Sequence, residues 1–315
     1  MNPLRFGVVG FGAMGRRHAR AIGRTDGVEL VVVADPSAAA RVEPAPGGRG
    51  PAGDVPVVAS LRALLEFGLD ACVVASPTPD HVDSAVRCAG AGLHVLIEKP
   101  MALDGDGCAR IVAAFSRSGT IGAVGHVERF HPAALELRGR LGAWGPGALR
   151  RIDTRREGGP PRRVDGGPVL LDLGTHDFDL VSWLTGERYE TATVRSRPAT
   201  GAPLGEAAIV EAVFPGGLEV RHSLSRRSSV PVRRATASCH DGSVLVADTL
   251  DTGSADPLSA QVAAFRDLIA GRLEAGDARA PTSLDDGARV VRLAAALMAP
   301  AGNRPAGESG RGGRS

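Results

Sequence analysis

The stretch from Arg5 to His18 constrains the fold more than any other part of this 315-residue chain. An apolar run ends in Gly10-x-Gly12-x-x-Gly15, and a helix-like pattern begins directly after it. Glycines at this spacing allow a tight strand-to-helix turn, a close approach of the backbone to a pyrophosphate, and close packing of the helix on the strand. The free N–H groups at the start of such a helix then point at the anion. The stretch therefore predicts a dinucleotide-binding turn.

An acidic residue at the end of the next apolar segment supports this prediction. Residues 28–35 have the pattern of a buried strand that ends in Asp35. A carboxylate there can accept hydrogen bonds from the ribose hydroxyls of NAD and would repel the 2′-phosphate of NADP. Arg41 could offset the repulsion if its loop folded back, so NAD is the predicted cofactor and NADP stays an alternative. The alternative to a dinucleotide site is a glycine-rich turn with a surface aspartate nearby and no bound ligand.

The composition excludes several classes of partner. A net charge of +2, with 23% charged residues, gives no reason to expect nucleic acid or an anionic membrane. No segment approaches the roughly 18 apolar residues that span a bilayer, and no signal-peptide pattern precedes the first predicted strand. We therefore expect a cytoplasmic protein without a bound metal. The cysteines lack C-x-x-C spacing, which predicts buried, reduced thiols; they are Cys72, Cys88, Cys108 and Cys239.

The apolar pattern divides the chain into two domains and a tail. Residues 1–124 alternate short apolar runs with helical patterns, which is typical of an α/β domain with a doubly wound parallel sheet. Residues 125–299 contain strand-like segments joined by tight turns and end in two helices, which predicts an α+β domain with an open, mostly antiparallel, meander-type sheet. Residues 300–315 have little apolar content and are predicted to be disordered. The two expected hairpin turns are 214–218 and 239–243, and the two expected helices are 257–275 and 283–298.

Two loops follow predicted parallel strands at their carboxyl ends. The first is Ser76-Pro77-Thr78-Pro79-Asp80-His81, and the second is Glu98-Lys99-Pro100. Ligands of open α/β sheets bind at this edge, so the Lys99 ammonium could reach a substrate hydroxyl. A bare Glu-Lys pair is equally compatible with a solvated turn.

Asp172 and His176 form a second candidate site. If this stretch is helical, the two residues lie at i and i+4 on one face. A carboxylate beside an imidazole raises the imidazole's pKa and orients the ring, which suits acid/base chemistry near neutral pH. An acid-rich helix start beside a core histidine is the alternative. A metal site with Asp179 as third ligand lacks the additional His or Cys that closed sites prefer.

These segments occur in the order and spacing of a known family. The glycine triad, residues 76–81, residues 94–100 and Asp172-x-x-x-His176-Asp177 resemble the Gfo/Idh/MocA oxidoreductases, and the resemblance runs from about residue 4 to about residue 298. It implies a Rossmann domain followed by an α/β domain whose open sheet commonly forms the oligomer interface, and hence a homodimer or homotetramer. It also implies a cis bond between Lys99 and Pro100.

The resemblance assigns roles to individual residues. Lys99, Asp172 and His176 would form the catalytic group: His176 would take the proton from a sugar or cyclitol hydroxyl, and Lys99 would hold the same oxygen. Asp172 would set the charge of the histidine, while the carbon passes a hydride to nicotinamide. The implied cofactor contacts are Gly10, Phe11, Gly12, Ala13, Met14, Gly15, Asp35, Ser76, Thr78, Pro79, His81, Glu98 and Lys99.

A further run, residues 124–133, is similar to a segment of family members that act on nucleotide-activated amino sugars. Arg-Phe-Asn-Pro is usual there, and this chain has His131 in place of Asn. Arg129 and His131 join the catalytic group as candidate substrate contacts, since a guanidinium can bind a phosphate bidentately. Pairing of Arg129 with Glu128 or another acid is the alternative. The arginines at 155, 156, 162 and 163 could meet an anionic substrate, but a charge run of this kind favours a solvated loop.

The predicted function is that of an NAD-dependent dehydrogenase that oxidises a secondary hydroxyl of a sugar, such as the 3-hydroxyl of UDP-N-acetylglucosamine. An NADPH-dependent ketosugar reductase and an inositol or cyclitol dehydrogenase share every residue named above. A regulatory protein that senses nicotinamide nucleotides is a further alternative. The intact trio of Lys99, Asp172 and His176 disfavours it, because a pure binder does not need the trio.

Overall fold

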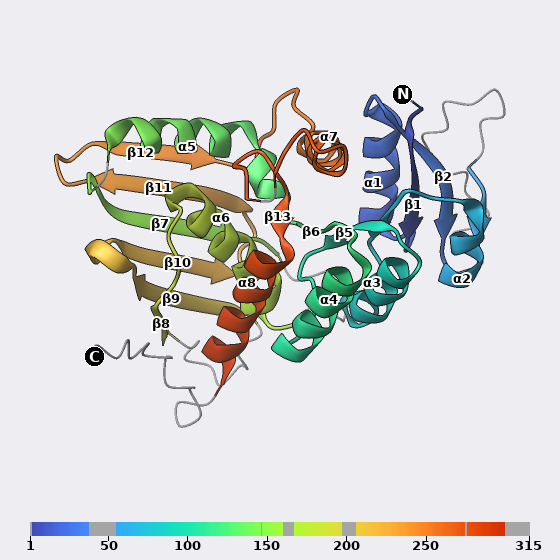
Figure 1. Cartoon of the computed structure of the whole chain (residues 1–315). Coiled ribbons are helices and arrows are strands. Elements are labelled where there is room, and N and C mark those ends of the chain that lie inside the picture. Colours follow the sequence, from blue (N-terminus) through green and yellow to red (C-terminus); the bar gives the residue numbers. More distant parts are fainter. Residues whose placement is uncertain are drawn as a thin grey trace, which may run out of the picture.

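The computed structural model describes residues 2–37, 55–145, 147–159, 167–196, 206–274 and 276–299. These residues form two sheets that lie side by side (Figure 1). The predicted tail, Arg41 and the arginines at 162 and 163 lie outside the described residues.

The first sheet is the predicted doubly wound sheet. Its order is β3-β2-β1-β4-β5-β6-β13, and its pairs are parallel except for β13, which lies antiparallel to β6. The order reverses between β1 and β4, and ligands of such sheets bind in the crevice at this switch point. The strands are β1 (Leu4–Val9), β2 (Val28–Ala34), β3 (Val57–Val58), β4 (Ala71–Val74), β5 (His94–Glu98), β6 (Gly122–Gly125) and β13 (Thr282–Ser283).

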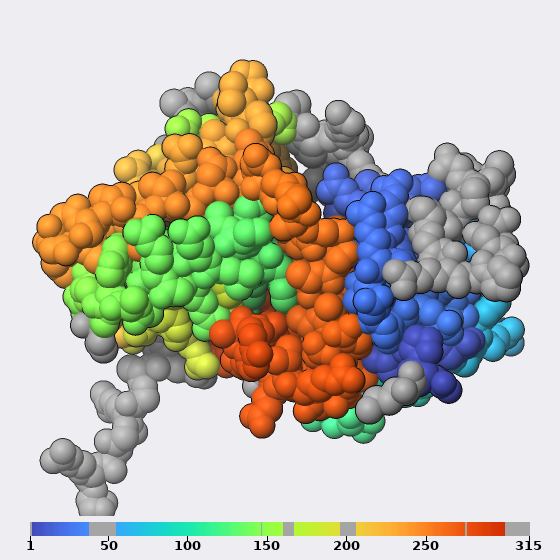
Figure 2. Space-filling model, turned by 90° about the horizontal axis from the view of Figure 1, so that it is seen from above, coloured from blue at the N-terminus to red at the C-terminus, as the bar shows by residue number. Residues whose placement is uncertain are grey.

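Helices cover both faces of this sheet because its strands are apolar on both sides. Helices α1 (Ala13–Arg24) and α7 (Pro257–Ile269) share one core with β1, where Phe265 meets Phe6 edge to face. Viewed from above, the orange segment that contains α7 lies between blue α1 and the green region of η4 (Val127–Phe130) and α5 (Pro132–Trp144) (Figure 2). The opposite core holds apolar residues of α2 (Leu61–Leu64) with η2 (Leu65–Phe67), α3 (His81–Gly90), α4 (Gly105–Ser118) and α8 (Leu284–Met298).

Two helix starts follow from local chemistry. Ser60 accepts a hydrogen bond from the Ala63 amide at the start of α2, and Ser283 accepts one from the Asp286 amide at the start of α8. Each serine thus satisfies an amide that has no partner within the first turn of its helix.

The second sheet has the order β12-β11-β7-β10-β9-β8. The predicted hairpins are confirmed: β9 and β10 flank η6 (Pro215–Gly217), and β11 and β12 flank residues 240–243. The prediction of a meander-type strand order is wrong at the centre of the sheet. There β7 lies between β11 and β10 and runs parallel to β10. The strands are β7 (Leu149–Glu157), β8 (Thr191–Ser196), β9 (Ala207–Val213), β10 (Glu219–Ser225), β11 (Val232–Cys239) and β12 (Val244–Asp248).

One face of this sheet packs against helices α5 (Pro132–Trp144) and α6 (Thr175–Thr185). Helix α5 was not predicted, although His131 caps it and Pro132 occupies its first turn, which are helix-start signals. Helix α8 contacts both α4 and α6, and therefore lies between the two sheets (Figure 1). The last segment of the predicted second domain thus returns to the first sheet through β13 and α8.

All four cysteines are buried and free, as the sequence predicted. Within the described ranges, no helix combines the length and the apolar character that crossing a bilayer requires.

Candidate active site

The glycine triad forms a turn that leaves no room for larger side chains. Gly10 has a φ of +89°, and a Cβ on it would lie 2.6 Å from the Ser76 Cα. A Cβ on Gly15 would lie 1.9 Å from the Gly10 carbonyl oxygen. The turn therefore brings the end of β1, the start of α1 and the loop after β4 together at the switch point.

The residues at this turn fit a dinucleotide. Gly12 caps α1 without a side-chain hydrogen bond, so the first amides of the helix, from Ala13 and Met14 onward, are available to an anion. The Ser76 hydroxyl is buried and has no partner among the described residues. Asp35 lies directly after β2, and its carboxylate accepts a hydrogen bond of 2.7 Å from the Phe11 amide. The cofactor contacts predicted on this edge are thus brought together.

Two predicted cofactor contacts have other partners in the structure. The His81 ring contacts the carbonyl oxygens of Pro100 (Nδ1, 2.9 Å) and Ser76 (Nε2, 2.9 Å), and is buried. The Glu98 carboxylate lies 2.6 Å from His18 Nε2 and accepts a bond from the Lys99 amide. Both side chains are therefore bonded within the protein. Thr78 and Pro79 lie in η3 (Thr78–Asp80), in the loop between β4 and α3.

Lys99 leaves β5 at the carboxyl edge of the sheet, as predicted. Its Nζ donates to Asp172 Oδ1 over 2.8 Å and to the Asp172 carbonyl oxygen over 3.0 Å. The Lys99–Pro100 bond is cis, as the resemblance implied. The contact joins the first sheet to the second domain at the predicted catalytic pair.

Asp172 lies in a π-helical turn, η5 (Leu170–Gly174), directly before α6. Its second oxygen, Oδ2, accepts a bond of 2.7 Å from Arg226. Burial works against ionisation of Asp172, but the charges of Lys99 and Arg226 outweigh it and hold the carboxyl pKa below its usual value. Asp172 is therefore an ionised carboxylate clamped between two cations.

His176 does not have the environment that the sequence predicted. Both Asp172 oxygens are bonded to other residues, and the pKa of His176 lies well below its usual value rather than above it. A π-helical turn bonds residues five apart, so the stacking of i and i+4 residues in a regular α-helix does not apply here. Burial is the main cause of the lowered pKa, and neighbouring basic groups add to it. They are Lys99, Arg156, His126 and Arg233.

The carboxylate nearest to the imidazole belongs to Glu128, in η4 (Val127–Phe130). Glu128 Oε1 lies 3.4 Å from His176 Nδ1 and accepts a 2.7 Å bond from Arg156. Burial works against its ionisation, but Arg156 outweighs burial and holds the Glu128 pKa below its usual value. Glu128 was expected only as a possible partner for Arg129. The solvated loop expected around Arg156 is wrong, because this residue is buried in β7. The available signal for Arg156 was its spacing, because it lies four residues after Ile152 and therefore on the same face of the strand.

Arg129 and His131 occupy structural positions. Arg129 is buried and forms two hydrogen bonds, of 2.8 and 2.6 Å, with the Asp179 carboxylate. The alternative left open by the sequence, pairing with an acid, is what the structure shows. His131 is buried and caps α5 by accepting a bond from the Ala133 amide. The Asp179 pairing thus occupies two nitrogens of Arg129, and the capping bond occupies Nδ1 of His131.

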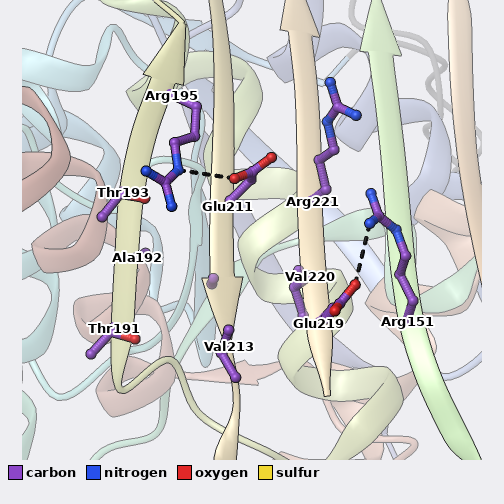
Figure 3. A pocket seen from close by; sticks show the side chains of 11 residues that line it. Arg151, Thr191, Ala192, Thr193, Arg195, Glu211, Val213, Glu219, Val220 and Arg221 are labelled. Atoms are coloured by element: carbon purple, nitrogen blue, oxygen red, sulfur yellow. Dashed lines mark hydrogen bonds and ion pairs between the residues drawn. The ribbon is translucent and has the colours of Figure 1, made fainter. Parts of the chain in front are cut away.

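A hollow of about 370 Å³ lies elsewhere, on the open face of the second sheet (Figure 3). Its side chains come from β7 to β10, and two ion pairs cross it, Arg195 with Glu211 and Arg151 with Glu219. It contains none of the predicted catalytic residues, and Lys99, Asp172 and His176 form the candidate active site. Among the residues that the structure describes, no group of three or more His, Cys, Asp or Glu side chains is arranged to hold a metal ion.

Comparisons with known proteins agree with this geometry. The family model described as oxidoreductase family, NAD-binding Rossmann fold, matches residues 4–126, and the model of the GFO/IDH/MocA C-terminal domain matches residues 110–245. The rhizopine catabolism protein MocA of Rhizobium meliloti is 31% identical over 67% of this chain and 67% of its own length. Inositol 2-dehydrogenase of Streptomyces avermitilis is 31% identical over 78% of this chain and 73% of its own.

UDP-N-acetylglucosamine 3-dehydrogenase of Acidithiobacillus ferrooxidans is 35% identical over 59% of this chain and 56% of its own length. Its solved structure matches with a TM-score of 0.75 at 25% identity, covering 95% of this chain and 97% of that chain. The chain therefore belongs to the Gfo/Idh/MocA family of NAD-binding oxidoreductases, which act on CH–OH groups.

Proposed function

We propose that this protein oxidises a secondary hydroxyl on the ring of a sugar, with NAD as the cofactor. The observation that carries the proposal is the 2.8 Å contact between Lys99 Nζ and the Asp172 carboxylate, directly beside His176. This group lies at the carboxyl edge of the parallel sheet, where the glycine turn, Ser76 and Asp35 fit a dinucleotide. A protein that only binds nucleotide has no need of an ammonium, a carboxylate and an imidazole at this place.

The residues divide the proton chemistry between them. Bound NAD supplies the hydride acceptor. His176 takes the hydroxyl proton, and its low pKa keeps the imidazole neutral and ready to act as a base at neutral pH. Lys99 holds the substrate oxygen and stabilises negative charge that develops on it. Asp172 fixes the position of Lys99, and Arg226 fixes Asp172.

Arg233 suggests that the substrate carries a negative charge. Arg233 on β11 is the register partner of the buried Arg156 on β7, so both side chains lie on the helix-covered face of the sheet. Unlike Arg156, Arg233 is exposed and has no carboxylate within ion-pair distance in the described part of the chain. Its charge nevertheless acts on Glu128 and His176. A phosphate of a nucleotide-sugar could supply the missing counter-charge.

A neutral cyclitol is the second candidate substrate. The match to an inositol 2-dehydrogenase covers more of this chain than the match to the UDP-N-acetylglucosamine enzyme. Arg129, which the sequence offered as a phosphate contact, is occupied by Asp179. The two classes differ in charge, so one arginine variant can separate them.

Substitution of Arg233 by glutamine tests the substrate class. Reduction of NAD is followed with UDP-N-acetylglucosamine, UDP-glucose, glucose 6-phosphate, glucose and myo-inositol. For a nucleotide-sugar, we expect the substitution to raise KM by roughly 10- to 100-fold, which corresponds to the ~1.5–3 kcal/mol of a hydrogen bond to a charged group. Arg234→Gln is the matched control, since Arg234 lies on the other face of β11 and pairs with Asp248. Turnover of myo-inositol alone, unaffected by Arg233→Gln, would assign the cyclitol instead.

Tight NAD binding without turnover of any sugar or of the corresponding ketosugars with NADPH would favour the sensing protein. In that case Lys99→Ala would leave its biological output unchanged.

We also propose that the protein is a homodimer or homotetramer joined through the open sheet face. Val213, Val244 and Val246 are exposed large apolar residues on this sheet, next to its surface ion pairs. Burying them against a second copy would remove this apolar surface from water. Light scattering at micromolar concentration is expected to give at least twice the chain mass, and a monomer would refute the proposal.

A further inference from the structure

We propose that Glu128 is the positioning residue of His176: its carboxylate accepts the Nδ1–H of the imidazole and so leaves the lone pair on Nε2, facing the substrate. The inference rests on the proposed function for the role of His176. It replaces Asp172, which the sequence had assigned to this task.

The first observation is an unsatisfied nitrogen. His176 Nδ1 is buried and has no hydrogen-bond partner in the part of the chain that the structure describes. A neutral imidazole carries a proton on one nitrogen and a lone pair on the other, and the group beside Nδ1 decides which is which. An acceptor beside Nδ1 gives the tautomer that a base needs at Nε2.

The second observation is that Glu128 is the available acceptor. Its Oε1 lies 3.4 Å from Nδ1, just beyond hydrogen-bond geometry, and catalytic hydrogen bonds of unliganded enzymes are often long and tighten in the complex. Asp172 is occupied by Lys99 and Arg226, and Asp177 is occupied by Arg156 and Thr154. An ionised carboxylate oxygen has room for both the Arg156 bond and the imidazole bond.

The third observation is that Glu128 is itself held rigidly. Arg156 donates from Nη1 to Glu128 and from Nε to Asp177, and all three side chains are buried. The guanidinium is planar, so its bond to Asp177 orients it, and its bond to Glu128 then holds Oε1 beside the imidazole. A chain of contacts therefore leads from Asp177 through Arg156 and Glu128 to the imidazole of His176.

The arrangement provides a matched pair of variants. Glu128→Gln and Asp177→Asn each remove one of the two carboxylates of Arg156, but only Glu128 lies beside His176. In the Glu128→Gln protein, Arg156 can only donate, so the amide oxygen turns to Arg156 and the NH₂ group faces Nδ1. The imidazole proton then moves to Nε2, where it blocks the base.

The test has two readouts. Nitrogen NMR of labelled protein, with the His176 signals identified by their loss in His176→Asn, is expected to show the proton on Nδ1 in the wild type and in Asp177→Asn, but on Nε2 in Glu128→Gln. Steady-state rates are expected to show kcat lower by roughly 10- to 100-fold in Glu128→Gln, with a smaller change in KM. The loss of kcat in Asp177→Asn is expected to be smaller than in Glu128→Gln. If Glu128→Gln does not fold, Glu128→Asp is measured instead, since its shorter side chain withdraws the carboxylate from Nδ1.

The pH profile adds a third readout. The groups that face His176 are Glu128, Lys99, Arg156, His126 and Arg233, with Asp172 on the preceding turn. Glu128 is the nearest anion, so its removal is expected to lower the pKa of His176 further and to move the acid limb of kcat/KM to lower pH. The Asp177→Asn substitution is expected to move the acid limb of kcat/KM less than Glu128→Gln does.

Two results would overturn the inference: a proton on Nε2 in the wild type, or equal losses of kcat in Glu128→Gln and Asp177→Asn. The NMR experiment needs no substrate. If no sugar is oxidised while the tautomers behave as expected, the proposed function fails and the positioning role of Glu128 stands.

Discussion

Substituting Lys99 by methionine is expected to lower kcat/KM by roughly 10²- to 10⁴-fold and to move the acid limb of its pH profile to higher pH. The rate falls because Lys99 Nζ is the group proposed to hold the substrate oxygen, and because Asp172 loses one of its two cations. The direction of the pH shift follows from the charges around His176. The Lys99 charge adds to burial in lowering the pKa of His176, so its removal lets that pKa rise. A base with a higher pKa becomes neutral, and therefore active, only at higher pH.

The Lys99→Arg protein separates charge from geometry. Its charge is retained, so the acid limb is expected to stay where it is in the wild type, whereas the bulkier guanidinium should still lower kcat. Rates measured across the acid range for the three proteins check both statements. An acid limb that does not move in Lys99→Met would show that His176 is not the titrating base.

Replacing His176 by asparagine is expected to lower kcat by roughly 10²- to 10⁴-fold while leaving the affinity for NADH unchanged. The imidazole is the proposed base, and its ring belongs to the second domain rather than to the glycine turn that fits the cofactor. Fluorescence titration with NADH measures the affinity, and steady-state reduction of NAD measures kcat.

His126→Asn is the control for this substitution. His126 is buried, and its ring lies edge to face with His176, with centroids 6.4 Å apart. We expect the loss of kcat in His126→Asn to be much smaller than in His176→Asn. Equal losses would mean that the rate depends on the packing of this imidazole pair and not on a proton at His176.

The parallel strands of the first sheet could be predicted from the sequence because their determinants are local, whereas β13 joins this sheet from residues 282–283. The spacing of Gly10, Gly12 and Gly15 encodes one turn, and each strand–helix unit follows from its own apolar pattern and caps. The hairpins of the second sheet are local in the same sense. The position of β7 between β10 and β11 is not determined locally. Its pairings join Glu157 to Ser225 and to Val232, which lie far along the chain.

The predicted catalytic residues lie near one another, but not through the contacts that the sequence predicted. The sequence placed Asp172 beside His176, whereas the structure binds Asp172 to Arg226, 54 residues away, and to Lys99, 73 residues away. The π-helical turn of residues 170–174 has no signature in the apolar pattern of the sequence. Arg129 shows the same limit, because its partner Asp179 lies 50 residues further on. Long-range ion pairs of this kind decide which charges are free to meet a ligand.

Transfer of deuterium from the substrate carbon to the cofactor tests the central claim most directly. The protein is incubated with NAD and a sugar that it oxidises, deuterated at the carbon of the reacting hydroxyl, and the reduced cofactor is analysed by mass spectrometry. The account predicts that the reduced nicotinamide carries the deuterium and that His176→Asn forms very little of it. Reduced cofactor without deuterium, or equal formation by the His176→Asn protein, would contradict it.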